Sequence, residues 1–411
     1  MKNSNIIGID ISMEYMLISF FHEGMREPET ISLINGSQIY KIPLCAAYDA
    51  KNGKWYFGDE AAAHGTHDEG CFIDHIFERA LRGESVHISD QDREAKDVLQ
   101  RFLRKILGHT ISFAGIPIPD QMIVTMDECK PEMIKLLSEI IELTGFAPNG
   151  VTFVDHIESF YYYALSQPRN LSIHDVLLYE ELGKSLKVTR LSHAGRSIPQ
   201  EIKLSSEGYP IEDSDKDTIF YDILKTTLEN HIVTTVYLTG DWFDDEWMNK
   251  SLSYMGKGRR VFAGKNLFCK GACYAAHWSQ HPNQWNYSYI GVNEIGVHVS
   301  LRITEKGKQR FLRLVTADSK WYESQKACEV ILSGEPAFDL WIQAPEQKDA
   351  TLRTLELTDF PVRQERMTRI RIEAVPKSAK EIVISVKDLG FGELCPGTLR
   401  VWNYCMQLDE R

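Results

Sequence analysis

The chain has 411 residues, a formal net charge of -12 and 43% hydrophobic residues, which suits two or three domains that each bury a core. The acidic balance disfavours nonspecific binding to nucleic acid or to anionic membranes, because both depend on basic patches. No apolar run is long enough to span a bilayer, and the start, MKNSNIIGIDISMEYM, has no signal-peptide hydrophobic region. Eight scattered cysteines are typical of a reducing compartment, so we expect a cytoplasmic protein without nucleic-acid or membrane partners.

The first 280 residues alternate between strand and helix patterns. Residues 6–21 predict two strands joined by a tight turn at Asp10-Ile11-Ser12, and further strands are expected at 39–48, 121–125 and 151–154. Apolar residues at helical spacing predict amphipathic helices at 92–107, ended by Gly108, and at 131–144, ended by Gly145. A further helix, closed by Pro168, is expected at 157–166. This alternation predicts an α/β domain.

The stretch 175–191, DVLLYEELGKSLKVTRL, is central to the organisation of the chain. An apolar run, a short turn around Gly183 and a run with period two together predict a β-hairpin. A hairpin tip that offers backbone amides beside an acid is suited to hold a phosphate and its metal. A polar loop, a helix at 218–230, a strand at 232–239 and a helix at 266–280 are expected to follow.

Beyond residue 283 the pattern changes to period two. Short strands are predicted at 296–303, 309–315, 327–332, 338–342, 367–374, 381–386 and 398–402. These strands predict an all-β sandwich over 283–411, and the boundary falls in the segment 279–289, which is rich in Pro, Asn, Gln and His.

Several short motifs follow one another in a fixed order: Ile7-Gly8-Ile9-Asp10, the hairpin 175–191, Leu238-Thr239-Gly240-Asp241, Lys270-Gly271-Ala272, and the strands within 355–388. In this order they resemble the first phosphate strand, second phosphate hairpin, adenosine motif, K-G-A helix and substrate-binding β-sandwich of the seventy-kilodalton heat-shock chaperones. That family belongs to the actin-like ATPase superfamily. The resemblance implies an α/β two-lobed actin-like ATPase fold over 1–282, with lobe I at about 1–170 and a reduced lobe II at about 171–282. An all-β sandwich without a helical lid follows.

The resemblance also implies a nucleotide cleft, with residues Asp10, Ser12, Glu180, Gly183, Ser185, Gly240 and Asp241. Its two phosphate loops depart from the family pattern. The first, D-L-G-T-T in the family, is DISME here, and the second, D-L-G-G-G-T, is EELGKS, which keeps one glycine of three. Losing these glycines removes backbone angles and space that phosphate oxygens need. We therefore expect no efficient hydrolysis and no catalytic residue, with ATP or ADP and Mg²⁺ bound weakly or not at all.

In the β-sandwich, the resemblance places the floor of a peptide cleft near Phe338, Leu340 and Trp341. An extended peptide could bind there through a strand edge and apolar pockets. The alternative, which the pattern favours, is that these residues alternate between ordinary core and surface positions.

Four potential zinc ligands, Cys269, Cys273, His277 and His281, recur every four residues in the helix expected at 266–280 and just beyond it. One straight helix cannot wrap four such ligands around one ion. Buried packing of the small residues is therefore favoured, and no metal site is assigned.

Two functional hypotheses follow. The first is a chaperone-like pseudo-ATPase, a non-hydrolysing scaffold that binds a protein or peptide partner. The alternative is a divergent ATP-binding chaperone ATPase, in which Asp10 and Glu180 hold the metal and phosphates. Actin-like self-assembly is a third possibility, against which the additional β domain argues.

Overall fold

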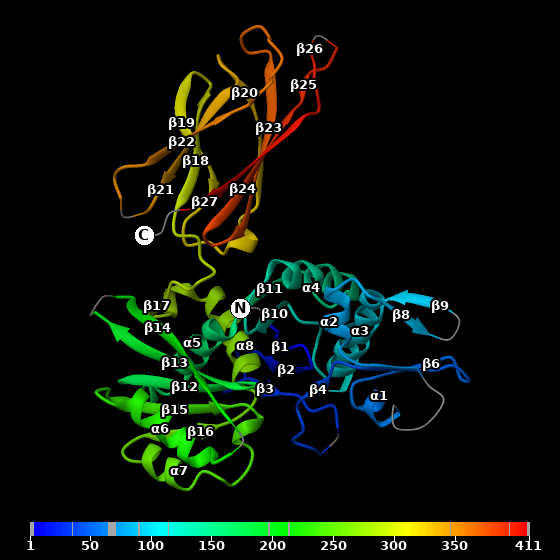
Figure 1. Cartoon of the computed structure of the whole chain (residues 1–411), viewed down its shortest axis with the longest axis vertical. Coiled ribbons are helices and arrows are strands. Elements are labelled where there is room, and N and C mark those ends of the chain that lie inside the picture. Colours follow the sequence, from blue (N-terminus) through cyan, green and yellow to red (C-terminus); the bar gives the residue numbers. More distant parts are fainter. Residues whose placement is uncertain are drawn as a thin grey trace. The chain divides into compact units, whose positions relative to one another are not determined.

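The computed structural model describes residues 4–34, 36–64, 71–88, 91–113, 115–195, 198–212, 214–345, 347–393 and 395–408 (Figure 1). The chain divides into two compact units, Met1–Tyr289 and Ile290–Arg411, which we call the first unit and the β unit. The division lies at the end of the segment 279–289, whereas the sequence places the domain boundary at 282/283. No helix among the described residues combines the length and hydropathy needed to cross a membrane.

The first unit contains two six-stranded sheets, each built around a hairpin. The first sheet has the order β11-β10-β1-β2-β3, and β4 also pairs with β2. Its strands are β1 (Ile6–Ile11), β2 (Tyr15–Phe21), β3 (Glu29–Thr30), β4 (Ile42–Pro43), β10 (Gln121–Met126) and β11 (Val151–Asp155). β1 and β2 are antiparallel, while β10 runs parallel to β1 and β11 runs parallel to β10.

The second sheet repeats this arrangement in the order β16-β15-β12-β13-β14-β17. Its strands are β12 (Asp175–Leu182), β13 (Ser185–Ala194), β14 (Gln200–Pro210), β15 (Val233–Thr239), β16 (Arg260–Ala263) and β17 (Tyr287–Ser288). β12, β13 and β14 form an antiparallel meander, and β15 and β16 continue parallel on the other side of β12. The prediction of a polar loop after the hairpin is wrong. Residues 200–210 instead form β14, whose side chains are mostly exposed and show no apolar alternation.

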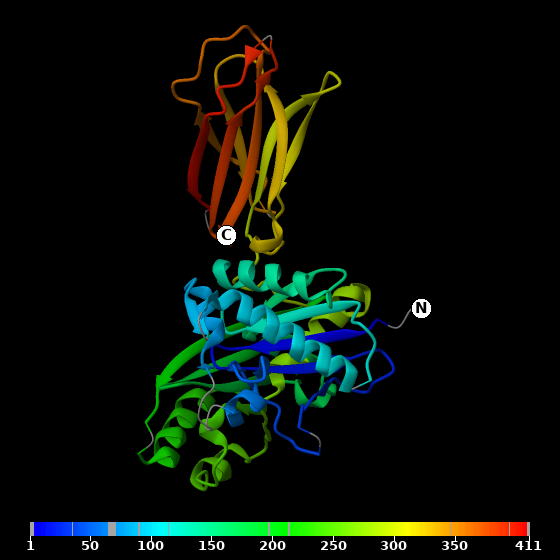
Figure 2. The ribbon, with the colours of Figure 1, turned by 90° about the vertical axis from the view of Figure 1, so that its right-hand side faces the viewer.

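Helices and small sheets surround the two large sheets. The helices are α1 (Asp59–His64), α2 (Ile76–Leu81), α3 (Ala95–Phe113), α4 (Pro131–Thr144), α5 (His156–Ser166), α6 (Lys216–Leu228), α7 (Lys250–Met255) and α8 (Leu267–Gln280). The short strands are β5 (Ala46–Asp49), β6 (Lys54–Phe57), β7 (Cys71–Ile73), β8 (Ser85–Ile88) and β9 (Gln91–Glu94). Figure 2 shows the cyan helix α3 and the teal helix α4 against one side of the first sheet.

The predicted helix 131–144 is confirmed at both ends, and its expected inward residues are buried. The predicted helix 92–107 is real but shifted: residues 92–94 belong to β9, and α3 continues through Gly108 to residue 113. Gly108 is therefore not a stop. It lies inside the helix where the ring of Phe146 comes close, so that an added Cβ would lie 3.3 Å from that ring.

Helix α8 links the two sheets through close backbone packing. A Cβ on Gly271 would lie 2.1 Å from the carbonyl oxygen of Ser159 in α5, and a Cβ on Gly8 would lie 2.3 Å from that of Cys269. Only glycine fits at these positions, so the helices and β1 can approach one another. Cys269 and Cys273 are fully buried in this packing, which is the structural role that the sequence favours for them.

The β unit consists of two four-stranded antiparallel sheets, drawn as two layers in Figure 2. One sheet has the order β19-β18-β21-β22, with β18 (His298–Glu305), β19 (Lys308–Val315), β21 (Ala337–Gln343) and β22 (Thr351–Glu356). The other has the order β20-β23-β24-β27, with β20 (Lys326–Leu332), β23 (Thr368–Ser378), β24 (Glu381–Asp388) and β27 (Val401–Gln407). A two-stranded ribbon, β25 (Gly390–Phe391) with β26 (Cys395–Pro396), completes the unit.

Candidate functional site

The two large sheets place one buried acid each at equivalent positions. Asp10 lies near the end of β1, beside Thr125 in the parallel strand β10. Glu180 lies near the end of β12, beside Thr239 in the parallel strand β15. Both carboxylates are buried, with 5% and 3% of each residue exposed. Buried carboxylates require a partner of opposite charge or hydrogen-bond donors.

That partner is the ring of His156, the first residue of α5. Its Nε2 lies 3.0 Å from Oδ1 of Asp10, and its Nδ1 lies 2.6 Å from Oε1 of Glu180. Because a carboxylate oxygen accepts hydrogen bonds, contact of both ring nitrogens with carboxylates requires the doubly protonated, positively charged ring. Phe268 stacks on the ring with 3.7 Å between centroids and 5° between planes. The imidazolium therefore bridges the two sheets.

The electrostatic balance favours the charged form of this ring. Burial disfavours the charge, but the neighbouring carboxylates of Asp10 and Glu180 outweigh burial and raise the pKa of His156 from 6.5 to about 10. The backbone places the ring because the preceding residue, Asp155, caps α5 by accepting a hydrogen bond from the backbone N–H of Glu158 at 2.7 Å. His156 is thus held at the helix start and charged at neutral pH.

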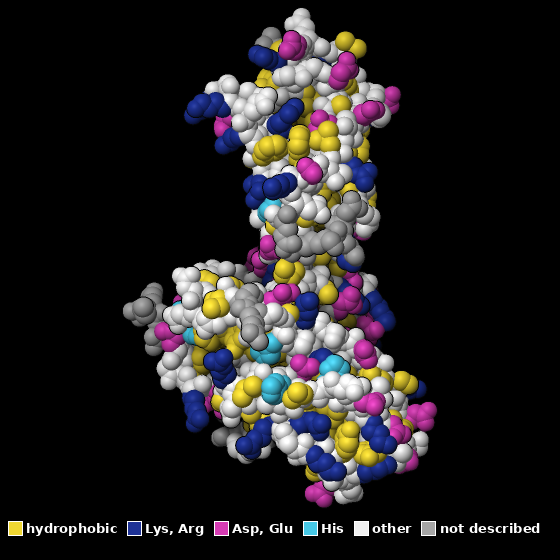
Figure 3. All heavy atoms as spheres, turned by 90° about the vertical axis from the view of Figure 1, so that its left-hand side faces the viewer, with side chains coloured by type: hydrophobic (Ala, Val, Ile, Leu, Met, Phe, Trp, Pro, Cys, Tyr) yellow, Lys and Arg dark blue, Asp and Glu magenta, His cyan; other side chains and the backbone are white. Residues whose placement is uncertain are grey.

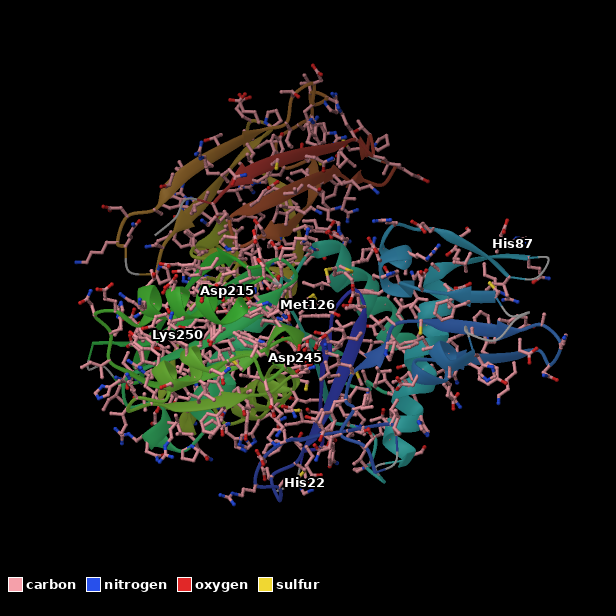
Figure 4. All side chains as sticks on the ribbon, turned by 60° about the horizontal axis from the view of Figure 1, so that its bottom comes forward. His22, His87, Met126, Asp215, Asp245 and Lys250 are labelled. Carbon is pink, nitrogen blue, oxygen red and sulfur yellow. The ribbon has the colours of Figure 1, made fainter. Side chains whose placement is uncertain are left out.

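A second cation lies on the other side of Glu180. Nζ of Lys187 is 2.7 Å from Oδ1 of Asp127 and 3.8 Å from Oε2 of Glu180. Asp127 directly follows Met126, the last residue of β10, which is labelled in Figure 4. Burial lowers the pKa of Lys187, but Glu180 and Asp127 outweigh it and raise that pKa above its ordinary value.

Asp127, His156 and Glu180 carry donor atoms close enough together for a metal ion to be considered. Their chemistry does not fit one, because both nitrogens of the His156 ring are engaged as donors to carboxylates. A metal ligand must instead offer an unprotonated nitrogen lone pair. The Lys187 ammonium also already neutralises Asp127. The site is an internal ion-pair network of the protein's own side chains.

Gly240 and Asp241 directly follow β15, whose last residue, Thr239, lies beside Glu180. The backbone of Gly240 has a φ of +119°, and an added Cβ would lie 2.4 Å from the Cβ of Glu181. This space admits the Glu181 carboxylate, which accepts a hydrogen bond from the backbone N–H of Trp242 at 2.6 Å. Asp241 pairs with Lys41 at 2.6 Å and with Lys265 at 2.7 Å. Burial raises the pKa of Asp241, but these lysines outweigh it and lower that pKa.

The remaining residues of the expected cleft make local hydrogen bonds. The hydroxyl of Ser12 accepts from the backbone N–H groups of Glu14 and Tyr15, at 3.3 and 3.1 Å, and so closes its own turn. The hydroxyl of Ser185 donates to the carbonyl of Leu182 at 3.3 Å. Gly183 occupies the hairpin turn with a φ of +64°. Of the residues predicted from the sequence, Asp10 and Glu180 are thus brought together by His156, whereas Ser12, Gly183 and Ser185 stabilise turns.

Comparison with known proteins identifies the family but no activity. Residues 27–292 match the C-terminal model of a family of unknown function, DUF5716. The chain belongs to this family. Residues 294–408 match a domain of unknown function, DUF8552. A search of curated proteins found no match.

In this DUF5716 member, the residues expected to form a peptide cleft divide between core and surface. Leu340 is fully buried in the sandwich core, so its side chain is not accessible to a peptide. Phe338 and Trp341 line a groove of about 710 Å³ in the β unit, together with Ile303, Val330 and Ile331. Figure 3 shows hydrophobic side chains gathered on one face of this unit.

His156 and Lys187, the two cations that define the site, are not predicted from the sequence as site residues. Signals for both exist: His156 follows a buried strand directly and begins a helix, and Lys187 lies opposite Glu180 in the hairpin register. Lys184, at the tip of the same hairpin, is exposed. A period-two pattern places Lys187 on the same face as Glu180 across the hairpin.

Proposed function

We propose that this chain is a chaperone-like pseudo-ATPase, a scaffold of actin-like ATPase ancestry that does not hydrolyse ATP and binds a protein or peptide partner. The repeated strand order of the two large sheets supports this ancestry. The equivalent placement of Asp10 and Glu180 at the ends of β1 and β12 supports it as well. The observation that carries the proposal is the His156 bridge between these two acids.

In an ATPase of this type, the acids at the two phosphate strands must be available to a hydrated Mg²⁺ ion, and the turns must offer backbone donors to phosphate oxygens. Here Asp10 and Glu180 share an imidazolium, and Lys187 adds a further positive charge beside Glu180. A metal ion would have to displace a charged, buried ring that stacks on Phe268. Breaking such a buried ion pair costs about 3–5 kcal/mol, which nucleotide binding would have to exceed.

Calorimetry with ATP, ADP and Mg²⁺ on the 411-residue chain tests the loss of nucleotide chemistry. We expect no heat of binding at micromolar nucleotide and no release of phosphate. If the protein bound ATP at micromolar affinity and hydrolysed it, and if Asp10→Asn abolished the hydrolysis, the divergent-ATPase hypothesis would replace this proposal. A binding signal without turnover would retain the scaffold and assign it a regulatory nucleotide.

The partner-binding part of the proposal rests on the β unit. β20 is the last strand of its sheet, so one edge of its backbone is available for pairing with an extended peptide. Ile331 in β20 is 51% exposed and lines the same groove as Phe338 and Trp341. An apolar side chain of a peptide could therefore bind in the groove while the peptide backbone pairs with β20.

Fluorescence anisotropy with short labelled peptides tests this binding mode. We expect a peptide with alternating apolar residues to bind, and a peptide of the same length with charged residues to fail. Ile331→Asp should abolish binding, whereas Ile232→Asp, at a 71% exposed position in the first unit, should leave it unchanged. Equal binding of both peptides, or equal loss in both variants, would remove the groove from the proposal.

A cytoplasmic location also belongs to this proposal. All eight cysteines are free thiols in the structure. A protein exposed to an oxidising compartment is expected to use cysteines in disulfides.

A further inference from the structure

A second cluster of metal-binding side chains lies away from the His156 bridge, where the end of α8 meets the β2–β3 loop. It consists of Glu23, which follows β2, and of His277 and His281 at the end of α8. The donor atoms of these three side chains all lie within 4.8 Å of one another. Figure 4 labels His22, the residue directly before Glu23, which marks this end of β2.

The hydrogen bonds of His281 fix which of its nitrogens is available. Its Nδ1 lies 2.9 Å from the backbone carbonyl oxygen of His277. Because a carbonyl oxygen only accepts, Nδ1 must carry the proton. The lone pair of the neutral ring is then on Nε2, and this atom lies 3.0 Å from Oε1 of Glu23.

Two lone pairs facing one another at this distance repel unless a cation lies between them. The cation can be a proton on His281, which would make a simple ion pair, or a metal ion. A backbone carbonyl that holds the other nitrogen of a histidine is the usual arrangement around a metal-bound imidazole, because it fixes the tautomer and the ring orientation. His277 supplies a further imidazole, with its ring centroid 4.7 Å from that of His281.

The two cysteines earlier in α8 are not available to a metal ion, in contrast to the two histidines. Cys269 and Cys273 lie on the same side of α8, nearer its start, and are fully buried. Cys269 accepts a hydrogen bond from the Ser19 hydroxyl, and Cys273 donates one to the Ser19 carbonyl. They are therefore committed to packing. Phe21 contacts the His277 ring edge to face, with centroids 5.4 Å apart, and so limits its movement.

We propose that Glu23, His277 and His281 form a binding site for a divalent transition metal, with Zn²⁺ as the best fit. Two imidazoles and one carboxylate are a donor set that Zn²⁺ accepts, and water would complete its four ligands. The ion would join the β2–β3 loop to the end of α8, segments more than 250 residues apart. This inference is independent of the proposed function.

The test uses the 411-residue chain without a histidine tag, stripped of metal by a chelator and dialysed. Titration with ZnCl₂ in a calorimeter is expected to show one bound ion per chain, and Co²⁺ should produce the visible absorption bands of a tetrahedral complex. Glu23→Gln and His281→Ala should each weaken Zn²⁺ binding by about tenfold or more, since even the loss of a supporting residue near a metal costs that much.

His87→Ala is the matched control, because His87 is 71% exposed and pairs with Asp92 outside the cluster. This variant should bind Zn²⁺ as the wild type does. Zn²⁺ should raise the melting temperature of the wild type and of His87→Ala, but not that of Glu23→Gln, a surface change that preserves side-chain shape. Absence of binding in the wild type would overturn the proposal and leave an ion pair only. Binding that persists unchanged in Glu23→Gln and His281→Ala would overturn it as well.

Discussion

Replacing His156 by glutamine tests the bridge between the two sheets most directly. Glutamine is neutral and can donate to one carboxylate, so Asp10 and Glu180 would be left buried without a shared cation. The rise in the pKa of His156 from 6.5 to about 10 corresponds to about 5 kcal/mol of stability as an upper bound. Removing one partner of a buried ion pair typically costs about 3–5 kcal/mol. We therefore expect His156→Gln to lower the free energy of unfolding by about 3–5 kcal/mol near pH 6.

The pH dependence has a definite sign. Because the pKa of His156 is raised in the folded state, its stabilising contribution is fully present below pH 6.5 and is lost as the pH rises through about 10. The difference in stability between wild type and His156→Gln should therefore shrink between pH 6.5 and pH 10. Other groups titrate in the same range, but they contribute to both proteins and cancel in this difference.

Urea denaturation of the wild-type chain and of His156→Gln at several pH values measures this difference. His87→Gln is the control, because His87 forms a similar pair with Asp92 at 2.9 Å on the surface. An exposed pair of this kind should contribute no more than about 1 kcal/mol. A second comparison measures the effect of Asp10→Asn on stability in both backgrounds. This change should destabilise the wild type but stabilise His156→Gln, where it removes one of two repelling charges. A pH-independent loss, or destabilisation by Asp10→Asn in both backgrounds, would refute the charged bridge.

Two further predictions concern the packing and the β unit. Burial disfavours the Asp388 carboxylate, but the Arg363 guanidinium 2.7 Å away lowers its pKa from 3.8 to about 2. The ionised Asp388 carboxylate therefore contributes about 2 kcal/mol to the free energy of unfolding above pH 3.8, and this contribution is lost as the pH falls through 2. Asp388→Asn should raise the pH midpoint of acid unfolding, measured by circular dichroism. Gly271→Ala should cost about 3 kcal/mol in urea denaturation, because its Cβ would meet the Ser159 backbone, whereas Gly208→Ala, which meets no atom within 4 Å, should be near neutral.

Local signals explain which elements can be predicted from the sequence. The helix 131–144 is predicted at its observed limits because Pro131 suits its first turn and Gly145 adopts the left-handed conformation that ends it, with a φ of 78°. The same reasoning fails at Gly108, where contact with Phe146 matters more than helix propensity. β14 escapes prediction because most of its side chains are exposed and polar on both faces, so that the strand carries no periodic signal.

The candidate site could be predicted only in part, because its components are far apart in sequence. The acids at the ends of the two hairpins follow from the strand and turn patterns, and the structure brings Asp10 and Glu180 to one ring. The ring itself belongs to His156, which lies 146 residues from Asp10 in the chain. Glu23 likewise lies more than 250 residues from His277. A single sequence gives local periodicity but no information on such distant contacts.

The positions of the glycines separate the scaffold from the chemistry. A Cβ on Gly8 or Gly271 would lie 2.3 or 2.1 Å from a backbone oxygen. The close packing of α8 against β1 and α5 therefore requires glycine at both positions. Around Gly183 there is open space instead. Under the proposed ancestry, Ser12 stands at a loop position where the heat-shock chaperones have glycine. Glycine is therefore present where it permits the two sheets to pack, and is scarce where it would admit phosphate. This pattern and the protein's own cation between the two acids support the proposal that the first unit holds its two sheets together and does not open and close around a nucleotide.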